Sequence, residues 1–457
     1  MIMTSQENEV NKELQRRREQ RRIRAEKRKK AEQERQKLLL RLALVGAVII
    51  LVTGLILAFS SGKLPGGQTD PTGSSGGTQP PESTSPGQET QTSPSGSETP
   101  TETAPSGVTV IHIAAAGDLN ITDQMVSSAL GPYGYDFTNA FLDVAPVLSQ
   151  ADLTVLNYEG TFGASQYGTE TGSAPAQLAQ ALADIGVDAV QTANSASIRA
   201  GILGLQSTIQ TLQNAGIAPV GTFADSSAYR SSGGYTILEV KGLRIALVGF
   251  TKGMDNLGLP EGSTDCVNLL YKDYTTTYDE INTDGIRRVL RNVAEEQPDL
   301  VIAMVHWGSE YNEAVSSSQR KIRTLLLDNG VDVILGTHSH LLKAVEHDTK
   351  KNTLVAWSLG DFYGDAEQPG SNYSIILDIE IHKDNATGEV TIAGFSYTPI
   401  YTVQPDESNA GGQRVVRIEE AMARYEGNYL GKVTESVYSS MEYALKRIAQ
   451  RLVEPVE

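Results

Sequence analysis

The sequence contains one cysteine, Cys266, in 457 residues. A single thiol excludes any disulfide within the chain, so a domain outside the cell would be held together by its core alone. Basic residues are also scarce beyond the first 41 positions, because residues 42–457 carry 24 Lys and Arg against 48 Asp and Glu. Nucleic-acid binding needs a basic face, so this acidic balance argues against nucleic acid as a partner.

Basic residues are concentrated at the start of the chain, where residues 1–41 carry 14 Lys and Arg against 7 Asp and Glu. The next segment, 42–59, is an uninterrupted apolar run that would span about 27 Å as a helix, close to the hydrocarbon thickness of a bilayer. Flanking Arg41 and Lys63 argue against a buried core helix, and the long basic segment argues against a cleaved signal peptide. We expect a single-pass membrane helix with a cytoplasmic N-terminus, by the positive-inside rule.

The segment that follows is rich in Gly, Ser, Thr, Pro, Gln and Glu and has almost no apolar side chains. Such a composition cannot bury enough surface to fold, and it predicts a disordered linker about 40 Å long. The main domain would therefore lie outside the cell, tethered to the cell membrane. The expected organisation is a cytoplasmic tail (1–41), a membrane helix (42–59), a linker (60–107), a folded domain (108–405) and a C-terminal helical extension (406–457).

After the linker, apolar strand-like runs alternate with amphipathic helices. Strands are expected at 108–118, 151–160, 187–194, 299–308, 331–340 and 353–362, with hairpins at 235–250 and 374–397. Helices are expected at 174–186, 203–216, 286–296, 319–329, 414–425 and 433–453. Buried strands separated by amphipathic helices predict an α/β fold.

Polar side chains lie where four of these strands end: Asp118; Asn157 with Glu159; His306 with Glu310; and His338 with His340. In α/β sheets the carboxyl ends of strands line the binding crevice. Carboxylate and imidazole together are the ligand mix for zinc, manganese or iron, so the pattern predicts a divalent metal at one or two sites. Two metals sharing a carboxylate would activate a water and clamp a phosphoryl or acyl oxygen.

Each of these residues also has a plainer interpretation. Asp118 follows a glycine and fits a turn or a helix cap. His306 fits a core histidine with a satisfied hydrogen bond, and Glu310 fits a solvated charge. His338 and His340 are harder to explain, because two imidazoles separated by one residue at a strand end have little packing purpose. Taken together, polar groups that converge at strand ends favour a binding site.

Five short motifs occur in a specific order: G-D at 117–118, N-Y-E at 157–159, H-W-G-S-E-Y at 306–311, G-T-H-S-H at 336–340 and S-L-G-D-F at 358–362. In this order and spacing, the region from about Val110 to Val403 resembles the CapA family of poly-γ-glutamate capsule synthesis proteins, which is related to calcineurin-like metallophosphoesterases. The resemblance implies a four-layer α/β/β/α sandwich with a metal-type site at the strand ends. It also implies a membrane-anchored role in making or exporting anionic poly-γ-glutamate, together with other capsule-synthesis membrane subunits.

The resemblance further implies two sets of metal ligands that share one carboxylate. One set would consist of Asp118, Glu159 and His340. The other would consist of Glu159, His306 and His338, with Ser195 as a weak fourth ligand at a position where the family has an asparagine.

The chain departs from the family pattern after its third strand, where A-N-S-A at 193–196 replaces A-N-N-H. Ala196 stands at the position of the expected acid and can neither transfer a proton nor bind a metal. A general acid typically contributes about 10²- to 10⁴-fold in rate. Asn194 is retained and, with Glu310, is a candidate for a catalytic role. Asp361, at the position of a family asparagine, is a milder change.

Three more residues are candidates for contact with a bound ligand. Arg199 replaces a family aspartate and would offer a fixed positive charge to a carboxylate-rich ligand, although a surface arginine explains it equally well. Asn157 and Trp307 are the others.

Three functional hypotheses remain. The first is a capsule-synthesis component with a partly degenerate metal site that binds or guides poly-γ-glutamate with little or no turnover. The second is an active metal-dependent hydrolase of phosphoester or γ-glutamyl amide bonds, and the third is a non-catalytic cell-wall binding domain. Fold alone does not separate them. The altered A-N-S-A motif favours the first and leaves catalysis an open question.

Overall fold

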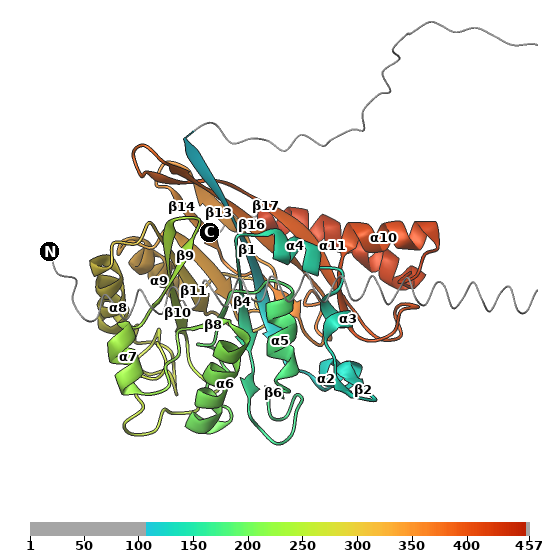
Figure 1. Ribbon diagram of the computed structural model, residues 1–457, viewed down its shortest axis with the longest axis horizontal. Coiled ribbons are helices and arrows are strands. Elements are labelled where there is room, and N and C mark those ends of the chain that lie inside the picture. Colours follow the sequence, from blue (N-terminus) through green and yellow to red (C-terminus); the bar gives the residue numbers. More distant parts are fainter. Residues whose placement is uncertain (1–106, 454–457) are drawn as a thin grey trace, which may run out of the picture. The chain divides into compact units, whose positions relative to one another are not determined.

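The computed structural model describes residues 107–453, which lie within one compact unit, 98–457 (Figure 1). The predicted tail, the predicted membrane helix and all but the last residue of the predicted linker lie outside the described residues. Within residues 107–453, no helix is both long enough and apolar enough to cross a bilayer. Strands and helices alternate along most of this region, so the predicted α/β class is confirmed.

The first sheet has eight strands and contains both parallel and antiparallel pairs. Its order is β18 (Arg414–Arg417), β17 (Val390–Val403), β16 (Tyr373–Asp384), β1 (Val108–Asn120), β4 (Leu153–Glu159), β7 (Ala189–Gln191) and β8 (Ala218–Val220). An eighth strand, β15 (Asp361–Tyr363), pairs with the end of β1. Strands β1, β4, β7 and β8 are parallel, so their carboxyl ends lie at one edge of the sheet.

The second sheet has six strands. Its order is β13 (Val345–Asp348), β14 (Thr353–Ala356), β12 (Val333–Thr337), β11 (Leu300–His306), β10 (Leu243–Thr251) and β9 (Thr236–Val240). The four central strands are parallel, and the two edge strands are antiparallel to their neighbours. Two short pairs complete the strands: β2 (Leu130–Gly131) with β3 (Gly134–Tyr135), and β5 (Thr161–Phe162) with β6 (Ser173–Ala174).

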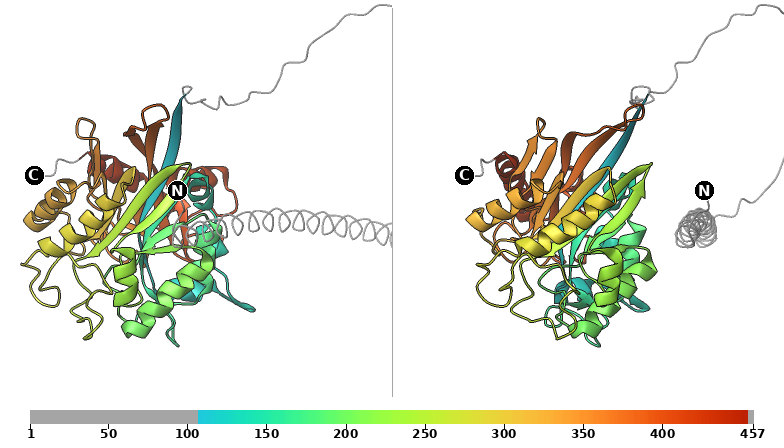
Figure 2. Two further views of the ribbon diagram at one scale, coloured as in Figure 1. Left: turned by 60° about the vertical axis from the view of Figure 1, so that its left-hand side comes forward. Right: turned by 90° about the vertical axis from the view of Figure 1, so that its left-hand side faces the viewer.

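The inner faces of the two sheets share one apolar core, as the alternation of side chains along each strand requires. In β1, Ile113 joins this shared core, whereas the next residue, Ala114, joins a separate core on the outer face. Leu247 of β10 and Ile302 of β11 contribute to the shared core from the second sheet. The sheets therefore pack face to face, with helices outside them (Figure 2).

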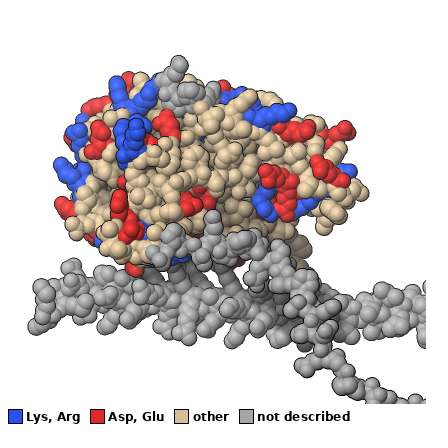
Figure 3. All heavy atoms as spheres, turned by 90° about the horizontal axis from the view of Figure 1, so that it is seen from above, with Lys and Arg blue, Asp and Glu red and all other residues tan. Residues whose placement is uncertain are grey.

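Within the described residues, seven helices are divided between the two outer faces. Those whose apolar side chains join the outer core of the first sheet are α2 (Asp123–Ala129), α3 (Thr138–Phe141), α4 (Ala145–Gln150), α5 (Gln177–Asp184) and α6 (Gly201–Ala215). Those that join the outer core of the second sheet are α8 (Thr283–Glu295) and α9 (Ser317–Leu327). Helix α9 begins at a capping box, in which Ser316 and Gln319 satisfy each other's backbone N–H groups. A short helix, α7 (Ser226–Ser232), precedes β9. On the face drawn in Figure 3, acidic and basic side chains are interspersed.

The C-terminal segment corrects one sequence expectation. The predicted helix at 414–425 is wrong in its first four residues, because Arg414–Arg417 form β18 against β17. Val415 and Val416 are both buried, one on each face of the sheet, and β-branched residues favour that environment. Helices α10 (Ile418–Gly427) and α11 (Glu435–Leu452) follow, and both contribute to the shared core.

A second correction concerns the run predicted as one strand at 353–362. In the structure it forms two strands in different sheets, β14 in the second and β15 in the first. The chain passes between the sheets at Gly360, which has a φ of +70°, a left-handed conformation that glycine adopts at little cost. This crossing places Asp361 beside Asp118, its partner in the β1–β15 register.

Candidate metal centre

The strand ends of both sheets meet at one place. Asp118 lies near the end of β1, Glu159 ends β4, and Asp361 begins β15, all in the first sheet. From the second sheet, His306 ends β11, and His338 and His340 follow the end of β12. All five predicted metal ligands, Asp118, Glu159, His306, His338 and His340, are therefore brought to one region.

These side chains form two clusters, in each of which three ligand-type atoms lie within 4.8 Å of one another. One cluster consists of Glu159, His306 and His338, and the other of Asp118, His340 and Asp361. The first is the set expected from the resemblance. In the second, Asp361 takes the place expected for Glu159, and the sequence had marked it only as a mild replacement. The sequence did contain a pattern that could have identified Asp361 as a ligand, because Gly-Asp occurs at both 117–118 and 360–361.

In the first cluster, the rings of His306 and His338 lie side by side, with centroids 4.4 Å apart. Nε2 of His306 lies 3.0 Å from Ser195 Oγ and 3.5 Å from Glu159 Oε1. Nδ1 of the same ring lies 3.3 Å from Thr337 Oγ1. Burial lowers the pKa of both imidazoles well below the usual value, and the neighbouring positive groups add to that effect. Both rings are therefore neutral near pH 7, which is the form that binds metals.

Two buried atoms of the first cluster have no hydrogen-bond partner among the described residues: Oε2 of Glu159 and Nδ1 of His338. An unsatisfied buried polar atom costs about 1–3 kcal/mol. A cation bound between the side chains would satisfy lone pairs of this kind. This carboxylate and imidazole set fits zinc, manganese or iron.

Asp118 is fully buried, and both of its carboxylate oxygens accept hydrogen bonds. Oδ1 accepts from Asn157 Nδ2 at 2.5 Å, and Oδ2 accepts from the backbone N–H of His338 at 3.0 Å. Burial raises the pKa of Asp118 to about 7. Burial, together with the charge of Asp118, raises the pKa of Glu159 to about 8. Below these pKa values each carboxyl group holds a proton that a metal would have to displace.

His340 is fixed by Asp361, whose Oδ1 lies 2.8 Å from His340 Nδ1 and also accepts from Asn120 Nδ2 at 3.0 Å. Burial alone would lower the pKa of His340, but the charge and hydrogen bond of Asp361 raise it well above the usual value. Burial raises the pKa of Asp361. The ring of Tyr311 stacks on His340, with centroids 5.2 Å apart.

The loop after β12 holds its two histidines in an uncommon backbone conformation. His338 has a φ of +86° and His340 a φ of +57°. Residues other than glycine seldom occupy this region, and such strain concentrates at functional sites. The loop therefore holds both rings in place at a cost in backbone energy.

The two predicted asparagines, Asn157 and Asn194, form hydrogen bonds that hold Asp118 in position. Asn194 Nδ2 donates to Asn157 Oδ1 at 2.9 Å and to the carbonyl of Tyr158 at 2.7 Å. Asn157 in turn donates to Asp118, so the three side chains form one buried chain of hydrogen bonds. Asn194 and Asn157 thus hold Asp118 in position. Ala196 is also buried, and its backbone N–H donates to Asn194 Oδ1 at 3.1 Å.

Two other predicted ligand contacts have partners within the protein. The indole of Trp307 is fully buried in the outer core of the second sheet, where its Nε1 donates to the carbonyl of Trp357 at 3.1 Å. The prediction that Trp307 contacts a ligand is therefore wrong. Arg199 forms an ion pair with Asp255 at 2.7 Å, and both side chains are partly exposed to solvent.

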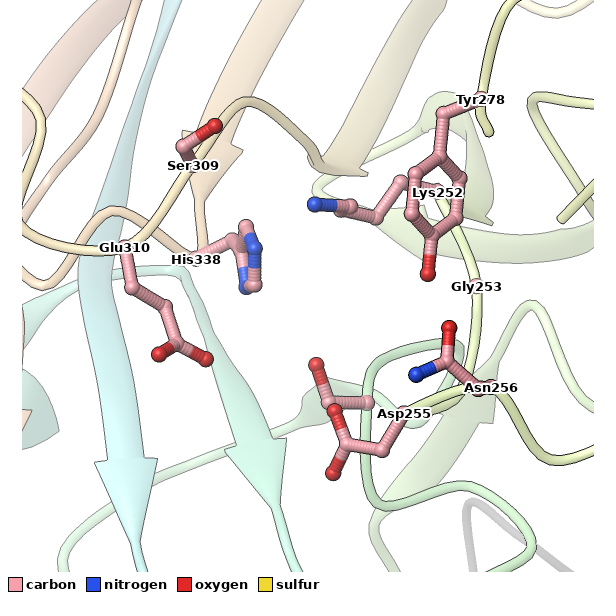
Figure 4. Close-up of a pocket in the computed structure, with 9 residues that line it drawn as sticks. Lys252, Gly253, Asp255, Asn256, Tyr278, Ser309, Glu310 and His338 are labelled. Carbon is pink, nitrogen blue, oxygen red and sulfur yellow. The ribbon is translucent and has the colours of Figure 1, made fainter. Parts of the chain in front are cut away.

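A cavity of about 290 Å³ opens beside the first cluster (Figure 4). His338 and Ser195 belong to its lining, and so does Glu310, which was a predicted candidate. Lys252 and Tyr278 also line it, and neither was identified from the sequence. Both lie in loops after β10 and outside the five motifs, so no motif marked them.

The region that holds both clusters is also the region that resembles known proteins. The family described as bacterial capsule synthesis protein PGA_cap matches residues 112–366, which include all six cluster residues. The PGA biosynthesis protein CapA of Bacillus subtilis (strain 168) is 25% identical over 226 residues, covering 48% of this chain and 52% of that protein. The capsule biosynthesis protein CapA of Bacillus anthracis is 24% identical over 282 residues, covering 59% and 64%. The chain thus spans less than two thirds of the length of either relative.

Among solved structures, similarity extends to a calcineurin-like phosphoesterase from Bacillus subtilis. It has 13% sequence identity and a TM-score of 0.39, covering 74% of this chain and 98% of that one. A 5'-nucleotidase from Candida albicans is similar at 10% identity and a TM-score of 0.38, covering 74% of this chain and 56% of that one.

Proposed function

The chain belongs to the bacterial capsule synthesis protein family, as its CapA-like motifs predicted, and we propose that it acts in the synthesis or export of poly-γ-glutamate. Two relatives are named for PGA biosynthesis and capsule biosynthesis. The family match covers more than half of the chain and includes both clusters of the metal centre. Within that role, the proposal assigns the metal centre to binding the polymer.

In this proposal, Glu159, His306 and His338 hold one divalent cation, and Asp118, His340 and Asp361 hold a second. A cation there would supply positive charge and Lewis acidity toward a carboxylate or amide oxygen. The protein's own contribution is to orient the ligands, through the Asn194–Asn157–Asp118 chain and through Asp361 at His340. The two sheets face each other and carry helices on their outer faces. We therefore include in the proposal that the domain is a four-layer α/β/β/α sandwich of the metallophosphoesterase type.

Binding without hydrolysis is the role that the missing acid favours. At the position of the expected histidine, Ala196 is buried and offers no proton. Ser195, at the position of an expected ligand, reaches His306 Nε2 at 3.0 Å. A second candidate, metal-dependent hydrolysis of phosphoester or γ-glutamyl amide bonds, is favoured by one observation: each cluster still provides three ligand side chains.

We further propose that residues 42–59 anchor the chain in the cell membrane, with the folded domain outside. The support is the apolar run and the basic segment that precedes it. On the outer side of the membrane, the domain would bind the polymer close to other capsule-synthesis membrane subunits.

Binding of poly-γ-glutamate by the full chain tests the proposal, with poly-α-glutamate as the matched polymer. Binding should require Mn²⁺ or Zn²⁺, should be lost with EDTA, and should be lost in the variant His338→Ala/His340→Ala. The control His382→Ala alters a partly exposed histidine near the end of β16 and should bind normally.

Hydrolysis assays separate the alternatives. Binding without release of nitrophenol or nitroaniline from p-nitrophenyl phosphate or γ-glutamyl p-nitroanilide would support the proposal. Metal-dependent turnover that disappears in the double variant would support the hydrolase instead. Polymer binding that is indifferent to metal and to both histidines would contradict a role for the metal centre.

A further inference from the structure

Lys252 places a partly buried positive charge at the wall of the cavity beside His338. Its backbone N–H donates to the carbonyl of His306 at 2.8 Å, which fixes the residue relative to the metal centre. Its Nζ donates to the carbonyl of Gly308 at 2.9 Å and lies 4.5 Å from the centroid of the Tyr278 ring. Figure 4 shows the ammonium group between Tyr278 and His338, directed toward the cavity.

The ammonium group of Lys252 is only partly satisfied. An ammonium has three donors, and among the described residues Nζ has one hydrogen-bond acceptor and no carboxylate within 4.0 Å. A partly desolvated cation with free donors is a site for an anion.

The surroundings of Lys252 make this charge distinctive. Of the nine residues that line the cavity, Lys252 is the one lysine or arginine, and Glu310 and Asp255 are the two carboxylates. Asp255, also in the lining, is paired with Arg199 at 2.7 Å. The volume of about 290 Å³ is close to the lower limit for small-molecule sites, about 300 Å³, and suits one or two residues of a polymer.

We propose that this cavity is a ligand subsite in which Lys252 binds the carboxylate of a γ-linked glutamyl unit next to the metal centre. Every residue of a γ-linked chain carries one free α-carboxylate close to its amide bond. One end of such a unit would therefore meet Lys252 while the adjoining oxygens meet the cluster that contains His338. The identity of the ligand rests on the proposed function, whereas the anion site rests on the contacts of Lys252.

Three variants of the full chain test the assignment by isothermal titration calorimetry in the presence of Mn²⁺. The probes are a γ-linked glutamate tetramer, an α-linked tetramer and inorganic phosphate. Lys252→Gln should weaken binding of the γ-linked tetramer about tenfold or more, and Lys252→Arg should recover part of the loss. The control Lys321→Gln, at an exposed lysine of α9, should bind as the unaltered chain does.

A second measurement uses the unaltered chain and does not depend on how a variant folds. The γ-linked tetramer should protect Lys252 from an amine-reactive reagent, as read by peptide mass spectrometry, and should leave Lys321 unprotected. Normal binding by Lys252→Gln, or an unprotected Lys252 in the bound chain, would overturn the inference while leaving the proposed function intact. Binding of phosphate but of neither tetramer would overturn both.

Discussion

The carboxylate of Asp118 accepts a hydrogen bond from the backbone N–H of His338, with 3.0 Å between the two atoms. Asp118 belongs to the first sheet, and His338 follows a strand of the second, so this bond joins the two sheets at the metal centre. A residue with the φ of His338, +86°, carries backbone strain of about 1–3 kcal/mol. A hydrogen bond to a buried carboxylate is strong enough to offset much of that strain.

The buried chain that positions Asp118 predicts a stability effect for Asn194→Ala. The change removes the donors to Asn157 Oδ1 and Tyr158 O and the acceptor for Ala196 N–H. Leaving these buried groups unpaired should lower the free energy of unfolding by about 3 kcal/mol. Urea unfolding followed by the fluorescence of the two buried tryptophans measures the change.

The matched control for this prediction is Asn214→Ala. Asn214 is exposed near the end of α6 and accepts one hydrogen bond, from Gln210. Its loss should change the free energy of unfolding by less than about 0.5 kcal/mol. Equal effects of the two changes would mean that the asparagine chain does not stabilise the centre.

A methyl group at Gly117 should disrupt the approach of β15 to β1. A Cβ atom at this position would lie 1.8 Å from the carbonyl oxygen of Gly360, so the backbone would have to move. We expect Gly117→Ala to lower the free energy of unfolding by about 3 kcal/mol. In the control Gly394→Ala, in β17, the added Cβ has no neighbour within 4 Å, and the change should stay below about 1 kcal/mol. Comparable stability of both variants would contradict the close approach of these strands.

Metal affinity should rise with pH between about pH 6 and about pH 8. The pKa of Asp118 is raised to about 7 and that of Glu159 to about 8, chiefly by burial. Below these values each carboxyl holds a proton that the cation must displace, and above them the ligands are already ionised. Calorimetric titration with Mn²⁺ at several pH values should show affinity that increases across this range. A flat or falling profile would mean that these carboxyls are not ligands.

The sequence predicted the ligands that follow regular patterns. Asp118, Glu159 and His306 each lie at or near the end of an apolar run, and the carboxyl ends of parallel strands meet at one edge. Asp361 was missed because its place depends on the crossing of the chain at Gly360, from one sheet to the other. No local pattern in the run from 353 to 362 reveals which sheet receives its second half.

The error at Trp307 has a simple physical cause. Successive side chains near a strand point to opposite faces, so the neighbour of a ligand such as His306 is directed away from the site. Trp307 accordingly packs in the outer core against Trp357, with ring centroids 5.4 Å apart. Trp307 lies within a motif but away from the site, whereas Lys252 lies outside every motif and lines the cavity. Its position at the cavity depends on tertiary contacts with Gly308 and Tyr278.

Metal content tests the central claim most directly. The full chain would be incubated with zinc, manganese and iron, freed of excess metal and analysed by mass spectrometry, beside the variant His338→Ala/His340→Ala. The control is His347→Ala, at a histidine of the edge strand β13. We predict about two divalent ions per chain in the unaltered protein and the control, and loss of both in the double variant. No bound metal, or equal metal in the double variant, would contradict the metal centre.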